Sequence, residues 1–179
     1  MRKTLAAGAL VAALALGGCG VQGTAPGPIA ETQESLTAED RDKAVQIYAF
    51  MRDPVMSKAH YCRDMYQSMV EAFNDRTEDR GDELSQYAER ISEASDEIAA
   101  VDRDALPDYL ASGYVWLKGA AENYSRAADA LVEAHSLNAQ GKVTEANDKV
   151  HDADFSADAA LDGIAKARDH FESELMGEF

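Results

Sequence analysis

The feature that most constrains the fold of this chain is a helical repeat of apolar residues, which begins after residue 36 and continues almost to the end. Its first stretch, residues 38–73, places apolar side chains on one face of a helix. These are Ala44, Ile47, Tyr48, Met51, Val55, Cys62, Met65, Tyr66, Met69 and Phe73. No stretch after residue 36 alternates with the two-residue period of a β-strand. The pattern therefore predicts an all-α protein.

Three further apolar stripes follow the first, and short polar turns that contain Gly or Pro separate them. They occupy residues 84–101, 107–138 and 142–176. Four amphipathic segments joined by short turns are typical of an antiparallel up-down four-helix bundle. We therefore expect residues 37–179 to form such a helical bundle domain.

Local signals add detail to this expectation. Thr37 is a candidate N-cap for the first helix, and Gly141 is a candidate for the left-handed residue that ends the third. The Asp53-Pro54 pair leaves open whether the first helix is kinked or interrupted. Because the second segment is the shortest, we expect any groove to lie beside it, where its longer neighbours are uncovered.

The N-terminus has a different character from the helical region. Arg2 and Lys3 precede residues 5–16, an uncharged run dominated by Ala and Leu, which is the order of charge and apolarity in a signal peptide. The run is about 12 residues long, whereas a membrane-spanning helix needs roughly 20. We therefore interpret it as a targeting segment and not as a membrane span.

The four residues that follow this run, Leu16-Gly17-Gly18-Cys19, resemble the lipobox of bacterial lipoproteins. The resemblance implies cleavage before Cys19 and attachment of acyl chains such as palmitate to it. Residues 1–18 would then be the lipoprotein signal peptide and residues 19–36, which are rich in Gly and Pro, a lipidated flexible tether. It also implies a location at the cell membrane, where the lipid anchor holds the protein on the extracytoplasmic face of the cell envelope.

The charge of the chain is strongly acidic. It carries 33 Asp and Glu residues against 17 Lys and Arg residues, a formal net charge of −16. Nucleic-acid binding requires a basic surface, so we expect no nucleic-acid partner. The remaining cysteine, Cys62, has no partner for an intramolecular disulfide if Cys19 is acylated, so stability has to come from a packed core.

One cluster of residues suggests a metal site. Cys62, Met65 and Met69 carry soft sulfur ligands of the kind that Cu(I) prefers, and they share one face of the first predicted helix. The same face carries Ile47, Val55 and Phe73, so packing in the core is the competing interpretation. His60 and Met56 are expected away from this face.

No arrangement of residues indicates catalysis. The chain has no nucleophile and base at recognisable spacing, no glycine-rich phosphate loop and no zinc-ligand pattern. We therefore expect a non-catalytic protein without a cofactor, which acts as a protein-interaction or accessory module of the bacterial envelope with an envelope protein as its unknown partner. The alternative is a carrier of copper or a small ligand that uses the Met and Cys stretch. Oligomeric state and host or prophage origin stay open.

Overall fold

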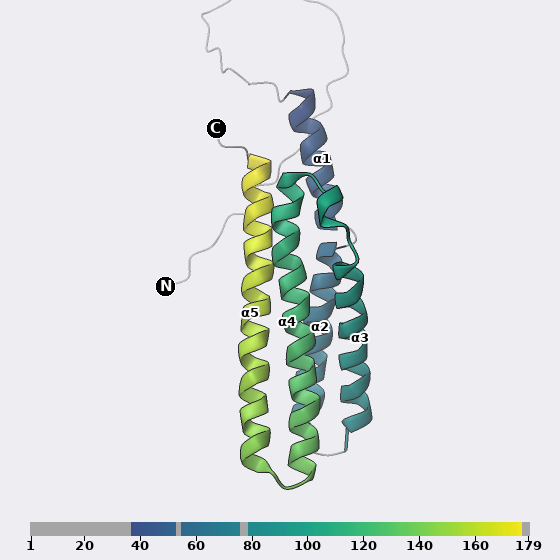
Figure 1. Ribbon diagram of the computed structural model, residues 1–179, viewed down its shortest axis with the longest axis vertical. Coiled ribbons are helices and arrows are strands. Elements are labelled where there is room, and N and C mark those ends of the chain that lie inside the picture. The colour runs from purple at the N-terminus through teal and green to yellow at the C-terminus, as the bar shows by residue number, and fades with distance from the viewer. Residues whose placement is uncertain (1–36, 53–54, 76–78, 177–179) are drawn as a thin grey trace, which may run out of the picture. The chain divides into compact units, whose positions relative to one another are not determined.

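The computed structural model describes residues 37–52, 55–75 and 79–176, which belong to one compact unit. These residues form five α-helices, one short 3-10 helix and no strand (Figure 1). In chain order they are α1 (Ala38–Arg52), α2 (Val55–Asn74), α3 (Gly81–Ala99), the 3-10 helix η1 (Arg103–Ala105), α4 (Asp108–Ala139) and α5 (Val143–Met176). The all-α prediction is confirmed for this part of the chain. Within the same ranges, no helix combines the length and the apolarity needed to cross a membrane.

The first predicted segment forms two helices, α1 and α2, in place of a single rod. Asp53 and Pro54, where a kink or break was expected, lie outside the described residues. The helical stripe also fails within α1, because Tyr48 is 62% exposed. This helix packs against parts of α2 and α5, and its buried side chains are Ile47 and Phe50.

The helix ends follow the signals in the sequence. Thr37 caps α1: its Oγ1 accepts a hydrogen bond from the Asp40 backbone N–H at 3.1 Å, and its own N–H donates to the Asp40 carboxylate at 3.0 Å. Gly141 has a φ of 77° and its N–H donates to the Asn138 carbonyl oxygen, which ends α4. Both cap predictions are confirmed.

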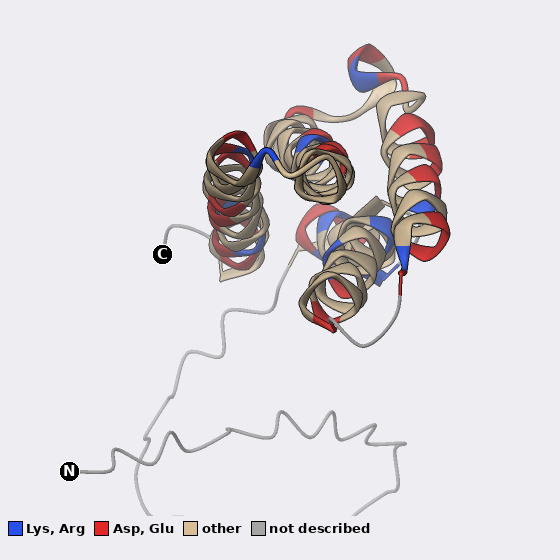
Figure 2. Ribbon diagram, turned by 90° about the horizontal axis from the view of Figure 1, so that it is seen from below, with Lys and Arg blue, Asp and Glu red and all other residues tan. Residues whose placement is uncertain are grey.

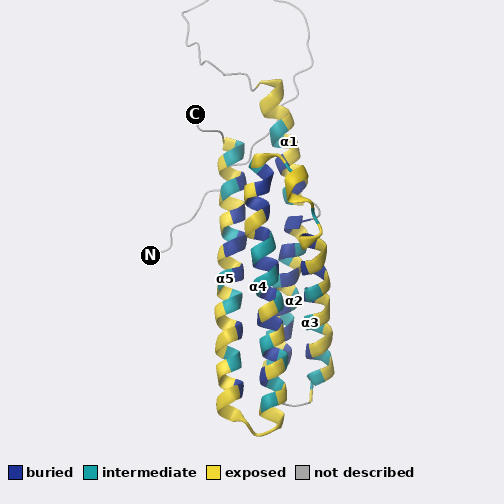
Figure 3. Cartoon of the chain, viewed as in Figure 1, coloured by how far each residue is buried: buried dark blue, intermediate teal, exposed yellow. Residues whose placement is uncertain are grey.

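Helix α4 is the central element of the unit. It packs along α5 most extensively and also contacts α2 and α3, while α2 and α3 contact each other. The buried faces of all four helices turn toward this shared interior, and exposed residues cover their outer sides (Figure 3). By contrast, α2 and α5 form no extended contact with each other.

Small residues at heptad spacing bring α4 and α5 together. One buried row belongs to α4 and the other to α5: Gly113, Ala120, Ala127 and Ala134 face Ala146, Ala153, Ala160 and Ala167. Side-chain size at the contact sets the distance between helix axes, so these rows permit a close approach. Gly163 extends the effect, since a Cβ there would lie 3.1 Å from the Trp116 carbonyl oxygen.

Candidate functional site

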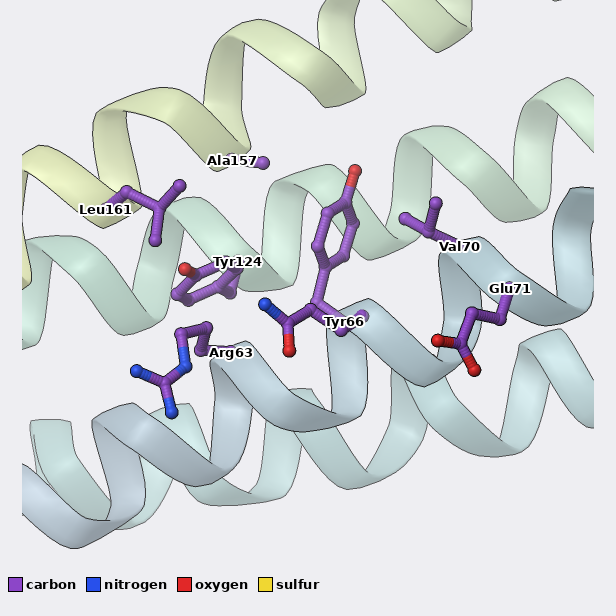
Figure 4. Close-up of a pocket in the computed structure, with 8 residues that line it drawn as sticks. Arg63, Tyr66, Val70, Glu71, Tyr124, Ala157 and Leu161 are labelled. Atoms are coloured by element: carbon purple, nitrogen blue, oxygen red, sulfur yellow. The ribbon is translucent and has the colours of Figure 1, made fainter. Parts of the chain in front are cut away.

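An apolar cavity lies between α2 and α5, with α4 as its floor. Its volume is about 350 Å³, and we call it the α2–α5 groove (Figure 4). The groove is lined by Arg63, Tyr66, Gln67, Val70 and Glu71 of α2, Tyr124 of α4, and Ala157 and Leu161 of α5. The groove exists because α5 packs mainly on α4 and forms no extended contact with α2.

Two tyrosines dominate the interior of the groove. Tyr66 is 6% exposed and Tyr124 is 1% exposed, and their ring centroids are 5.7 Å apart with the planes tilted by 42°. In Figure 4, Tyr66 extends from α2 toward α5, and Tyr124 lies between Arg63 and Leu161. The small side chain of Ala157 leaves room for the Tyr66 ring on the side of α5.

Neither tyrosine hydroxyl has a hydrogen-bond partner among the described residues, although both oxygens are buried. A buried polar atom without a partner costs about 1–3 kcal/mol, so native proteins satisfy nearly all of them. Burial raises the pKa of Tyr66 to about 12, with a further contribution from the charges of Asp154 and Asp158. Burial likewise raises the pKa of Tyr124 to about 12. At neutral pH both phenols are therefore protonated and can donate or accept hydrogen bonds.

The charges around the groove are mainly negative. Glu71 lines it, and Asp154 and Asp158 act on Tyr66 from α5; all three are exposed. The one basic lining residue, Arg63, already forms an ion pair with Asp64 at 2.7 Å. Seen from one end of the helices, acidic positions outnumber basic ones around the unit (Figure 2). A ligand in the groove therefore meets apolar walls and a negative rim.

A second cavity, of about 410 Å³, lies at the ends of α2 and α4 and the start of α5. Its lining includes Asn74, His135 and Asn147, so its surface is more polar than that of the α2–α5 groove. His135 Nε2 lies 3.1 Å from a carboxylate oxygen of Asp79. A hydrogen bond from the Gly81 N–H and then the contact with His135 hold the pKa of the Asp79 carboxyl below its usual value. The imidazole thus has a partner within the chain.

The structure places the predicted sulfur ligands in and beside the core. Cys62 and Met69 are fully buried and Met65 is half-buried. The Cys62 thiol faces α3 and donates to the Ile91 carbonyl oxygen at 3.8 Å, and burial raises its pKa to about 11. Metals bind the thiolate, so this environment gives no support to the copper hypothesis. Among the described residues, no group of three His, Cys, Asp or Glu side chains is placed to hold a metal ion.

Met56 and His60, which are close to the sulfur residues in the sequence, differ in burial. Met56 was expected away from the apolar face, but it is 4% exposed and belongs to the core. That prediction was wrong because α2 is enclosed by α1, α3 and α4, so more than one stripe of it is covered. His60 is half-buried, and desolvation followed by the charge of Arg63 lowers its pKa.

The predicted location of the groove also needs correction. The cavity beside α3 that includes Lys58, Arg90 and Glu97 is lined mostly by charged side chains. The apolar groove lies instead on the side of α2 toward α5. The sequence analysis places Tyr66 on the apolar stripe of residues 38–73, and Tyr124 and Leu161 lie within the later stripes. It does not predict the groove, because an unpaired hydroxyl has no signature in the sequence.

Cys19 and the whole of residues 1–36 lie outside the described residues. The lipidation site, the signal peptide and the tether therefore stay predictions. Comparison with known proteins finds no matching family model, no matching curated protein and no matching solved structure. The groove has to be interpreted from its own geometry.

Proposed function

We propose that this chain is a lipoprotein anchored to the bacterial cell membrane on its extracytoplasmic face, where it acts as a non-catalytic protein-interaction or accessory module of the envelope. The lipobox-like Leu16-Gly17-Gly18-Cys19 supports the anchor. The acidic charge of the chain supports solubility at a crowded surface and disfavours nucleic-acid binding.

The arrangement that serves this role is an up-down antiparallel bundle of α2, α3, α4 and α5. Two observations support it: each helix packs on the next one along the chain, and short connections join them. In such a bundle the first and last helices would normally close the ring. Here α2 and α5 form no extended contact, and the groove lies between them.

The observation that carries the proposal is the α2–α5 groove with its two unpaired hydroxyls. A concave apolar surface with a few convergent polar groups is the common form of a binding site. The two phenols have a pKa of about 12, so they serve as hydrogen-bonding groups and not as bases at neutral pH. Binding without catalysis is the activity that these side chains support best.

The anchor is tested by labelling cells with a radioactive fatty acid. We expect the wild-type chain to incorporate palmitate and Cys19→Ala to lose the label and to leave the membrane fraction. Cys62→Ala is the matched control, because Cys62 is buried and cannot be acylated in the folded protein. Label retained in the Cys19 variant would contradict the lipoprotein assignment.

The binding surface is tested by placing a photo-crosslinking amino acid at Gln67 on intact cells. Gln67 is exposed and lines the groove, whereas Gln86 is also exposed but lies on α3, outside the cavities described above. We expect a discrete crosslinked product from position 67 and none from position 86. We further expect Leu161→Asp, which puts a charge on the apolar wall, to abolish the product. Equal products from both positions would argue against the groove.

A further inference from the structure

The two tyrosine hydroxyls of the groove need a partner that the described residues do not provide. Both oxygens are buried and unpaired, and both side chains line the same cavity. Each hydroxyl can donate one hydrogen bond and accept others. A hydrogen-bonding group on a ligand would therefore satisfy hydroxyls that the described residues leave unpaired.

The aromatic rings and the nearby charges determine whether the hydrogen-bonding group of the ligand should be positively or negatively charged. Tyr66 and Tyr124 present two tilted aromatic surfaces, which attract a cation through the ring quadrupole. Asp154 and Asp158 act electrostatically on Tyr66, and Glu71 lines the groove with no cation paired to it in the described residues. The one cation in the lining, Arg63, is paired with Asp64, and both charges act on Tyr124, that of Arg63 more strongly. An ammonium group is attracted by the rings and the carboxylates, whereas a carboxylate is repelled by both.

We propose that the α2–α5 groove binds a small organic cation, in which an ammonium group is attached to a flat apolar body. The ammonium lies against the tyrosine rings and donates to one of their hydroxyl oxygens, and the body packs on Val70, Ala157 and Leu161. The volume of about 350 Å³ is near the lower limit for small-ligand pockets and too small for a stretch of partner helix. This inference rests on the proposed function in one respect, that the groove is the binding surface.

The outer wall of the groove includes a side chain that is free to move. Leu161 forms part of the outer wall and is 48% exposed. Exposed side chains change rotamer within nanoseconds, so the wall can open without movement of a helix.

The test uses the full chain in detergent and three probes that share one ring system: naphthylmethylamine, naphthylmethanol and naphthylacetic acid. Affinity is measured by calorimetry at physiological salt, which screens attraction to the overall charge. We expect the amine to bind roughly tenfold more tightly than the alcohol, and the acid to bind most weakly. An alcohol or acid that binds as tightly as the amine would overturn the proposal, and so would a lack of binding by the amine.

Charge variants on α5 separate the groove from general attraction to an acidic protein. We expect Asp154→Asn combined with Asp158→Asn to weaken amine binding roughly tenfold. The control is Asp148→Asn combined with Asp152→Asn, which removes the same charge from exposed positions of α5 that are not among the charges acting on Tyr66. Equal losses in the two double variants would reduce the binding to nonspecific attraction and overturn the proposal.

The hydroxyls are tested by Tyr66→Phe and Tyr124→Phe. Because each variant removes an unpaired buried oxygen, we expect an unchanged or higher melting temperature together with weaker amine binding. A lower melting temperature with unchanged amine affinity would show that the hydroxyls support the fold and not the ligand, which would overturn this part of the proposal.

The crosslink from Gln67 separates this inference from the proposed function. If the amine does not bind but Gln67 still crosslinks to a partner, the inference fails and the proposed function stands. If the amine binds but Gln67 gives no crosslink, the protein-interaction function fails and the ligand site stands.

Discussion

Replacing Phe171 with alanine is expected to lower the free energy of unfolding by about 3–5 kcal/mol, which is the usual cost of emptying a fully buried aromatic site. Phe171 is 0% exposed and its ring meets Phe50 edge to face, with the centroids 5.7 Å apart. It also fills the space left by the missing side chain of Gly113. The ring of Phe171, on α5, thus packs against both α1 and α4. Its removal would leave a cavity between these three helices.

Chemical denaturation followed by far-UV circular dichroism measures this effect on the full chain. Phe155→Ala is the matched control, since Phe155 lies on the same helix and is 78% exposed. We expect the control to change the free energy of unfolding by less than about 0.5 kcal/mol. Similar losses in the two variants would contradict the assignment of Phe171 to the core.

The second large effect is expected at Gly113 on α4. A Cβ at this position would lie 2.2 Å from Cζ of the Phe171 ring, so Gly113→Ala forces the ring or the helix to move. Such overpacking typically costs about 1–3 kcal/mol. Gly119 lies on the same helix, and a Cβ there would have no heavy atom within 4 Å. We expect Gly119→Ala to stabilise the protein by up to about 1 kcal/mol, because alanine is the better helix former.

A double-mutant cycle tests the cause of the Gly113 effect. When Phe171→Ala is already present, the cavity can accept the added methyl group, so Gly113→Ala should no longer destabilise the protein. An undiminished loss in that background would mean that the ring is not the obstacle. If Gly113→Ala and Gly119→Ala changed the free energy of unfolding by the same amount, the close packing of α4 on α5 would be contradicted.

Local patterns in the sequence predicted those parts of the fold that depend on near neighbours. The caps at Thr37 and Gly141 were predictable because the contacts that define them lie within a few residues. The helical periodicity likewise predicted an all-α chain. The same periodicity was wrong for Tyr48 and Met56, because their exposure depends on which other helices surround α1 and α2.

The candidate site was less predictable than the fold. Tyr66, Tyr124 and Leu161 have the spacing of packing residues, and they do pack in part. The hydroxyls of the two tyrosines are also buried without partners, beside a negative rim. This arrangement depends on the absence of an extended contact between α2 and α5. Cys62 shows the opposite case, because its side-chain chemistry suggested a ligand and its burial raises the pKa of the thiol to about 11.

The sequence by itself determined the helical class, the helix caps at Thr37 and Gly141, and the acidic character of the chain, because periodicity, capping and charge are local or additive properties. Only the tertiary structure decided that α5 packs on α4 through small residues and leaves its side toward α2 open. The physical reason is that a groove results from the contacts between helices that are distant in the chain. Each helix contributes only part of the groove lining. The sequence of one helix does not determine whether another helix will pack against it.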